Sequence, residues 1–98
     1  MSQKSGATRR DPGFTEKQGQ YLAFIYTYSH IFRRAPAETD MQRHFGVSPP
    51  SVHQMVLTLE RAGFIRRQPG VARSIELLVA PQALPILDWL KINPSKPL

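Results

Sequence analysis

The first periodic run of apolar residues predicts a helix from about residue 16 to Arg33 or Arg34. Thr15 stands just before the run and Gln18 follows three positions later, which is the capping-box signature of a helix start. Apolar side chains then recur at helical spacing, at Tyr21, Ile25, Tyr28 and Phe32. The two arginines suit the carboxyl end of a helix dipole, and Pro36 disfavours helical backbone at the residue before it. This helix is therefore expected to end before "APAE".

A second, shorter helix is expected from about Glu38 to Phe45. Acidic residues stand in its first turn, and Met41 forms an apolar pair with Phe45, four positions on. Gly46 ends it, because glycine readily adopts the left-handed conformation that follows many helices. The link "GVS" is short and contains a glycine, which is typical of a helix-turn-helix.

The third helix is expected to begin after Ser48, a good N-cap, with Pro49 at its first position. Pro50 is tolerated there as well, because first-turn N–H groups have no partner inside the helix. The apolar face of this helix carries Val52, Val56 and Leu59. Gly63 predicts its end near Ala62.

After residue 63 the pattern changes to two short runs with strand character, "FIRR" and "SIELLV". Pro69 and Gly70 form a turn signal between them, so we expect a β-hairpin over residues 64–79. A short helix around residues 82–91, interrupted by Pro85, is also possible. The predicted fold is mainly α with a small β-hairpin, in the order of a winged helix-turn-helix. We divide the chain into a flexible basic arm (1–13), the winged helix (14–79) and a carboxyl-terminal segment (80–98).

The composition restricts the chemistry that the chain can perform. Its 98 residues suffice for one small domain, and a net charge of +6 favours a polyanionic partner, although such an excess can simply aid solubility. The chain has no cysteine, and its histidines, His30, His44 and His53, do not follow zinc spacing. We therefore expect no cofactor, metal or enzyme activity. Neither a membrane span nor a signal peptide is visible in the sequence, so we expect a cytoplasmic protein.

The winged-helix order points to double-stranded DNA as the polyanion, with the third helix in a groove. Its first-turn N–H groups are expected to bind phosphate, and its polar side chains to reach base edges. The candidate contacts on this helix are Ser48, Pro50, Ser51, His53, Gln54, Thr58 and Arg61. Gln54 suits a bidentate contact with adenine. The alternative is that these residues form only the solvated face of an amphipathic helix.

The predicted wing adds basic candidates. Strand alternation places Arg66 and Arg67 on opposite faces, so we expect Arg73 and only one of these two to contact phosphate or the minor groove. A solvated hairpin edge that prevents strand pairing is the competing interpretation. Arg9 and Arg10 in the arm are further candidates.

Residues 14–79 resemble the amino-terminal DNA-binding domain of the LexA repressor family. The resemblance rests on the order and spacing of "FTEKQGQYLAFI", "AP", "RHFG", "SP", "LERAGFI" and "PGVARSIEL". The domain is also similar to MarR-like winged-helix regulators. The resemblance implies a sequence-specific transcriptional regulator in the bacterial nucleoid, with the third helix in the major groove and the wing on the backbone or minor groove.

This sequence departs from the LexA pattern at the reading helix. Pro50 stands where that family carries a base-reading asparagine, and His53 and Gln54 stand where it carries glutamates. The resemblance therefore implies the fold and the docking mode but not the operator sequence. We expect no self-cleaving domain, for which the 98 residues leave no room.

Two further questions stay open at the level of sequence. The fold could serve as a protein–protein interaction module without specific DNA binding. The first helix and the carboxyl-terminal segment also carry more apolar residues than a single buried stripe needs, which suggests a homodimer. A monomer in which the carboxyl-terminal segment covers the first helix is the alternative.

Overall fold

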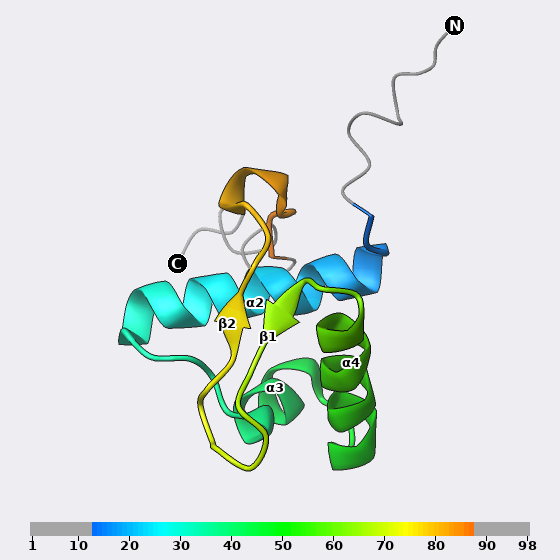
Figure 1. Ribbon diagram of the computed structural model, residues 1–98, viewed down its shortest axis with the longest axis vertical. Coiled ribbons are helices and arrows are strands. Elements are labelled where there is room, and N and C mark those ends of the chain that lie inside the picture. Colours follow the sequence, from blue (N-terminus) through cyan, green and yellow to red (C-terminus); the bar gives the residue numbers. More distant parts are fainter. Residues whose placement is uncertain (1–12, 88–98) are drawn as a thin grey trace, which may run out of the picture.

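A computed structural model describes residues 13–87 and has the predicted winged helix-turn-helix fold (Figure 1). Its elements are α2 (Glu16–Phe32), α3 (Glu38–Phe45), α4 (Pro49–Arg61), β1 (Ile65–Arg66), β2 (Glu76–Leu77) and the 3-10 helix η1 (Pro81–Ala83). Residues 1–12 of the predicted arm lie outside the described part. Within residues 13–87 no helix is long and apolar enough to cross a membrane.

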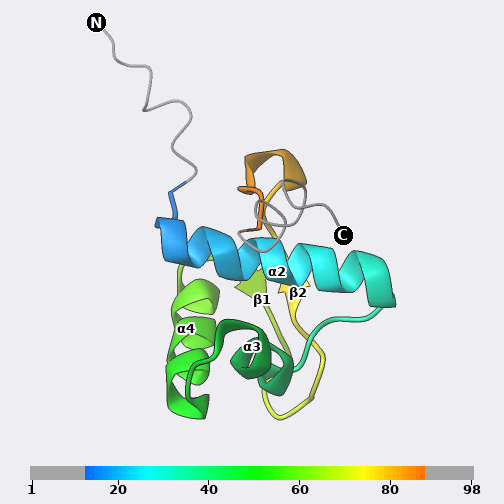
Figure 2. The same ribbon diagram turned by 180° about the vertical axis from the view of Figure 1, so that it is seen from behind.

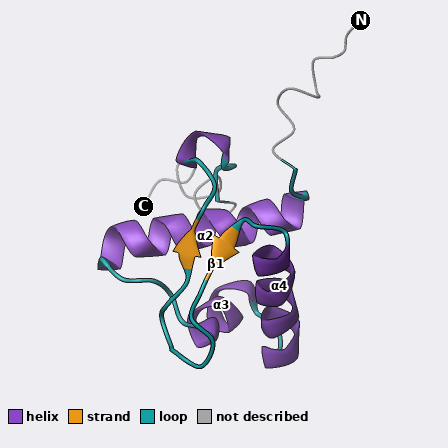
Figure 3. Ribbon diagram, viewed as in Figure 1, coloured by secondary structure: helices purple, strands orange, loops and turns teal. Residues whose placement is uncertain are grey.

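The helix α2 runs across the molecule, and α3 and α4 lie on one side of it (Figures 1 and 2). The hairpin begins beside α2, and its loop extends to the end of the molecule at which α4 starts (Figure 3). The wing loop and the first turn of α4 therefore share one end of the domain.

Local capping explains why the helices begin where the sequence predicts. The Thr15 hydroxyl oxygen accepts the Gln18 N–H at 3.1 Å, and the Gln18 carbonyl oxygen Oε1 accepts the Thr15 N–H at 2.9 Å. This reciprocal pair is the predicted capping box. Gly46, with φ of 66°, ends α3, and the Ser48 hydroxyl caps α4.

The apolar faces of the three helices meet in one core. Its most deeply buried side chains come from all three helices and from β1: Leu22, Ile25, Met41, Val52, Val56, Leu59 and Ile65. Tyr21 stacks on Phe45 with ring centroids 4.1 Å apart, which joins α2 to α3. The predicted core faces of α3 and α4 are confirmed. That of α2 is confirmed at Tyr21 and Ile25 but is wrong at Phe32, which is 55% exposed at the end of the helix.

The hairpin is shorter than the predicted span of 64–79. The strands pair only at Ile65↔Leu77 and Arg66↔Glu76, and the Leu78 N–H donates to the Phe64 carbonyl at 2.8 Å. Pro69 cannot donate to a strand ladder, and Arg73 has φ of 57°, outside the β region. Most of the segment between the strands is therefore a loop.

The prediction of a helix over residues 82–91 is wrong for residues 82–87, the part of this span that the structure describes. Only η1 is helical, and Leu84 is extended, with φ of −83° and ψ of 144°, because it precedes Pro85. The segment then lies against α2, where the Gln20 side-chain amide donates to the Ile86 carbonyl at 3.2 Å and Leu87 is buried. Residues 88–91 of the predicted helix lie outside the described part.

Gly19 lets this segment approach α2. A Cβ at this position would lie 2.9 Å from Phe14 Cε1 and 3.1 Å from Pro85 Cγ. Alanine favours a helix over glycine by about 1 kcal/mol, but overpacking a core costs about 1–3 kcal/mol. We therefore predict that Gly19→Ala lowers the free energy of unfolding by about 1 kcal/mol, measured by urea denaturation.

The double variant with Pro85→Ala is the control for this prediction. Because the proline ring is one of the two side chains that a Cβ at position 19 would crowd, the alanine should cost less in that background. A stabilising effect of Gly19→Ala in the parent chain would contradict the packing argument.

Candidate nucleic-acid interface

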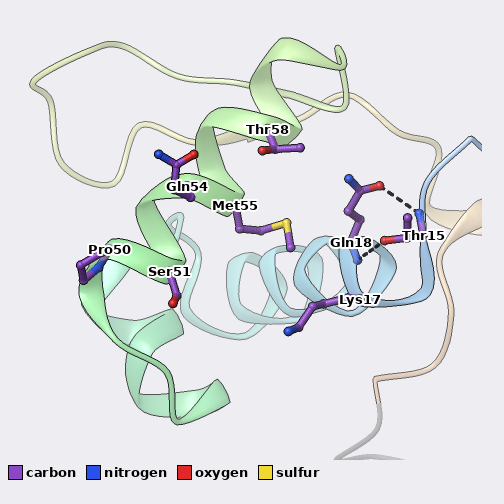
Figure 4. A pocket seen from close by; sticks show the side chains of 8 residues that line it. All are labelled: Thr15, Lys17, Gln18, Pro50, Ser51, Gln54, Met55 and Thr58. Carbon is purple, nitrogen blue, oxygen red and sulfur yellow. Dashed lines mark hydrogen bonds between the residues drawn. The ribbon is translucent and has the colours of Figure 1, made fainter.

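The outer side of α4 presents its candidate residues in two directions. Toward α2, the helix lines a groove of about 510 Å³ with Pro50, Ser51, Gln54, Met55 and Thr58. The first turn of α2 forms the opposite wall with Thr15, Lys17 and Gln18 (Figure 4). His53 lies on the other flank, in a groove of about 530 Å³ between the helices and the wing. Arg61 is exposed in the last turn.

The backbone of the first turn of α4 has no N–H group left for a phosphate, so that expectation is wrong. Pro49 and Pro50 have no N–H. The Ser51 N–H donates to the Ser48 hydroxyl oxygen at 3.3 Å, and the Val52 N–H donates to the Ser48 carbonyl at 3.1 Å. A phosphate beside this turn has to be held by side chains.

The two serines of this turn have different roles. The Ser48 hydroxyl accepts the N-cap hydrogen bond and donates its own hydrogen to Ser51 Oγ at 3.0 Å. Ser48 is therefore occupied by the helix start. The Ser51 hydroxyl accepts that bond and keeps its own hydrogen to donate, so it is the better placed of the two for a ligand.

His53 is tied to α3. Its Nδ1 lies 3.2 Å from the carboxylate oxygen Oε2 of Glu38, and both side chains are partly exposed. Gln54, one position on, is exposed and hydrogen-bonds to no described residue. Gln54, unlike His53, therefore has both its donor and its acceptor groups available for a base edge.

Arg66 and Arg67 lie on opposite faces of the hairpin, as strand alternation predicts. Arg66 is 66% exposed and its Nε donates to Glu76 Oε1 at 2.8 Å, across the strand pair. Arg67 is 17% exposed and its Nε donates to Glu60 Oε1 of α4 at 3.1 Å. Both arginines therefore have carboxylate partners inside the domain, and only Arg66 faces solvent.

Arg73 does not point outward as the sequence suggested. Its Nη1 lies 3.1 Å from the Tyr28 hydroxyl, 3.2 Å from the Ala35 carbonyl and 3.1 Å from Asp40 Oδ2. Its guanidinium also lies 5.9 Å from the centre of the Tyr28 ring. Arg73 has a left-handed backbone conformation, and its side chain lies inward, where it ties the wing loop to α2 and α3.

Asp40 is the centre of this tie. Its side chain is 10% exposed, and its Oδ2 also accepts the Ala37 N–H at 2.8 Å at the start of α3. Burial by itself would raise the pKa of Asp40, but the Ala37 hydrogen bond and the Arg73 charge outweigh it and lower the pKa below the ordinary value. The carboxylate therefore stabilises the fold in its charged form.

Comparison with known proteins identifies the domain. A family model described as the N-terminal DNA binding domain of the iron dependent repressor matches residues 13–71. The chain belongs to this family of repressor DNA-binding domains.

LexA repressors are also similar to this chain. It is 36% identical to the LexA repressor of Thermosipho africanus over 72 residues, which cover 74% of this chain and 36% of that protein. It is 39% identical to the LexA repressor of Thermosipho melanesiensis over 64 residues, 65% of this chain and 32% of that protein. The chain thus spans about a third of the length of these relatives.

The family name refers to iron, and an iron ion would need several ligand side chains close together in this repressor domain. Among residues 13–87, no three His, Cys, Asp or Glu side chains gather in one place. The donors that do meet, such as His53 and Glu38, form a pair only. The described part of the domain therefore does not fit an iron ion, and we assign it none.

One residue of the groove between α2 and α4 is not among the candidates that the sequence predicts. Lys17 of α2 shares a groove with Ser51 and Gln54 of α4, although more than thirty positions separate them. Its place after the capping box fixes it in the first turn of α2, but nothing in that local pattern indicates which helix it faces. Its place in the groove arises from the packing of α2 on α4.

The Asp40 network generates a prediction about pH. A carboxyl whose pKa is lower in the folded state than in the unfolded state contributes stability above its unfolded value, and that stability is lost as the pH falls through the folded value. We expect the free energy of unfolding to decrease as the pH drops below the ordinary aspartate value of 3.8. In Asp40→Asn this decrease should be smaller, as measured by urea denaturation over the same pH range.

Arg43→Ala provides the matched control, because Arg43 is 76% exposed and lies 3.5 Å from the other oxygen of Asp40. It should leave the pH dependence close to that of the parent chain. If Asp40→Asn retained the full acid-induced loss, the network would not be its source.

Proposed function

We propose that this domain is a sequence-specific regulator that binds double-stranded DNA and acts as a repressor, with α4 in the major groove. The observation that carries the proposal is the surface formed by Ser51 and Gln54, which are exposed near the start of α4, while Val52, Val56 and Leu59 of the same helix pack into the core. The wing loop extends to the same end of the domain (Figure 1). A helix and a wing that face the same way suit a groove and its flanking backbone.

Within this mode the α4 residues have separate roles. Gln54 reads a base edge, with adenine as the base that its amide matches, and Ser51 donates to a base or a phosphate. Pro50 and Thr58 contribute shape beside them, and Arg61 meets the backbone beyond the last turn. His53 remains beside Glu38 and contacts DNA from that position.

The wing arginines divide between contact and support. Arg66 is the exposed one, and its guanidinium reaches a phosphate while Glu76 orients it. Arg67 and Arg73 hold the wing in place through Glu60 and Asp40, so their effect on DNA is through the position of the loop. This replaces the expectation that Arg73 itself contacts DNA.

A salt titration of DNA binding tests the proposal. The preferred site is first selected from a random DNA library, and the affinity for it and for random DNA is then measured at several salt concentrations. Phosphate contacts give a logarithmic affinity that falls linearly with the logarithm of salt concentration. The alternative, a winged-helix module that docks on proteins, predicts no selected site and no preference over random DNA.

Replacing Gln54 with alanine should separate base reading from general affinity. Loss of a bidentate contact costs about 1–3 kcal/mol on the preferred site, and binding to random DNA should hardly change. Fluorescence anisotropy with both DNAs measures the two effects. Equal losses on both DNAs would remove Gln54 from a base-reading role.

We also propose that two copies pair through the second half of α2. Tyr26, Ile31 and Phe32 remain 42%, 61% and 55% exposed there, while the carboxyl-terminal segment covers the first half. Isologous pairing would present two copies of α4 to two half-sites.

Sedimentation equilibrium should detect a dimer at micromolar concentration that Ile31→Glu converts to a monomer, because the glutamate would place a charge in the apolar contact. This variant is preferable to truncation after Val79, since truncation would also remove the buried Leu87. Thr39→Glu, at an exposed position on α3, is the charge-matched control. A monomeric parent chain that still binds one half-site would exclude the dimer.

A further inference from the structure

We infer that the groove between α2 and α4 holds the phosphate backbone of one DNA strand, with Lys17 as its cationic contact. The inference rests on the proposed DNA-binding function and adds a contact from a second helix. It starts from the first turn of α4, in which no backbone N–H is free, so that a phosphate beside this turn needs side-chain donors.

The distribution of charge within the domain is the second step. The basic residues of the wing, Arg66, Arg67 and Arg73, each lie within 4 Å of a carboxylate of the domain. Among residues 13–87, four basic side chains have no such partner: Lys17, Arg33, Arg34 and Arg61. Of these, Lys17 alone lines the groove beside Ser51 and Gln54.

The groove itself offers donors and no negative charge. No acidic side chain is among its lining residues. Besides the Lys17 ammonium group, it has the Ser51 hydroxyl, the Thr15 hydroxyl and the side-chain NH2 of Gln18. The capping box uses only the oxygen atoms of these last two side chains as acceptors, so their hydrogens stay available. Figure 4 shows Lys17 and Ser51 on opposite walls.

The groove on the other flank of α4 makes a useful contrast. It is of similar size, about 530 Å³, but Glu38 lines it together with His53, Arg67 and Arg73. A carboxylate there repels a phosphate, and the arginines already have partners. The two flanks of α4 are therefore unequal, and the flank toward α2 suits an anionic strand better.

The salt dependence of binding tests this inference. A single phosphate contact contributes about 0.9 to the slope of logarithmic affinity against logarithmic salt concentration on B-DNA. Lys17→Ala should therefore reduce the slope by about 0.9, while Lys17→Arg should retain it. Arg34→Ala is the matched control, because Arg34 is also exposed and without a carboxylate partner but follows the far end of α2.

Replacing single phosphates of the selected site with neutral methylphosphonates locates the contact. One such replacement should weaken binding by the parent chain and have no further effect on Lys17→Ala, while every other replacement should change the affinity of both proteins by the same factor. An unchanged slope in Lys17→Ala would overturn the inference. An equal reduction of the slope by Arg34→Ala would overturn it too, because the loss of any positive charge would then have the same effect.

The two proposals fail in different ways. A parent chain without salt-dependent DNA binding would remove the proposed function and this inference together. A parent chain that binds its selected site through Gln54, and whose slope does not change in Lys17→Ala, would remove only the contact in the α2–α4 groove.

Discussion

The position of the wing relative to the helices depends on the interactions of the Asp40 carboxylate. This carboxylate accepts the Ala37 N–H at the start of α3 and pairs with Arg73 of the wing, whose Nη1 also reaches Tyr28 of α2. The hairpin has only two residue pairs in its ladder, too few to hold a loop of this length by themselves. Side chains of α2 and α3 therefore hold the wing loop in place of a longer ladder.

Other acidic residues also pair with basic side chains, and these pairs determine where the domain has free positive charge for a ligand. Glu38, Asp40, Glu60 and Glu76 all lie within 4 Å of basic groups, and all of these pairs belong to α3, α4 or the wing. Over residues 13–87 the eight Lys and Arg side chains exceed the five Asp and Glu side chains by three, and this excess of positive charge is therefore not spread evenly. The wing, which looks most basic in the sequence, is largely neutralised, and the flank of α4 that faces α2 keeps its positive charge.

The helices could be predicted from the sequence because the residues at which they begin and end are set by side chains a few positions away in the chain. The bond between Thr15 and Gln18, the left-handed turn at Gly46 and the cap at Ser48 all form within a few residues, so the printed sequence contains their cause. The direction of Arg73 does not have a local cause, because its partner Asp40 lies 33 positions away. Lys17 likewise lies toward α4 because of the way α2 packs on α4. No local sequence pattern predicts that packing.

Because of the two prolines at the start of α4, the residues proposed to read bases differ from those proposed to hold the phosphate backbone. Each proline ring fixes φ near −65°, so the first turn is ordered before any ligand arrives and has little entropy left to lose on binding. The same rings remove the N–H groups that would otherwise hold a phosphate at this end of the helix. Anchoring then has to come from side chains, and the cation across the groove is Lys17, with the Ser51 hydroxyl on the opposite wall. In the proposed complex Gln54 is left for the bases. A helix of this kind can change the base that it reads at Gln54 without disturbing its own cap, which belongs to Ser48.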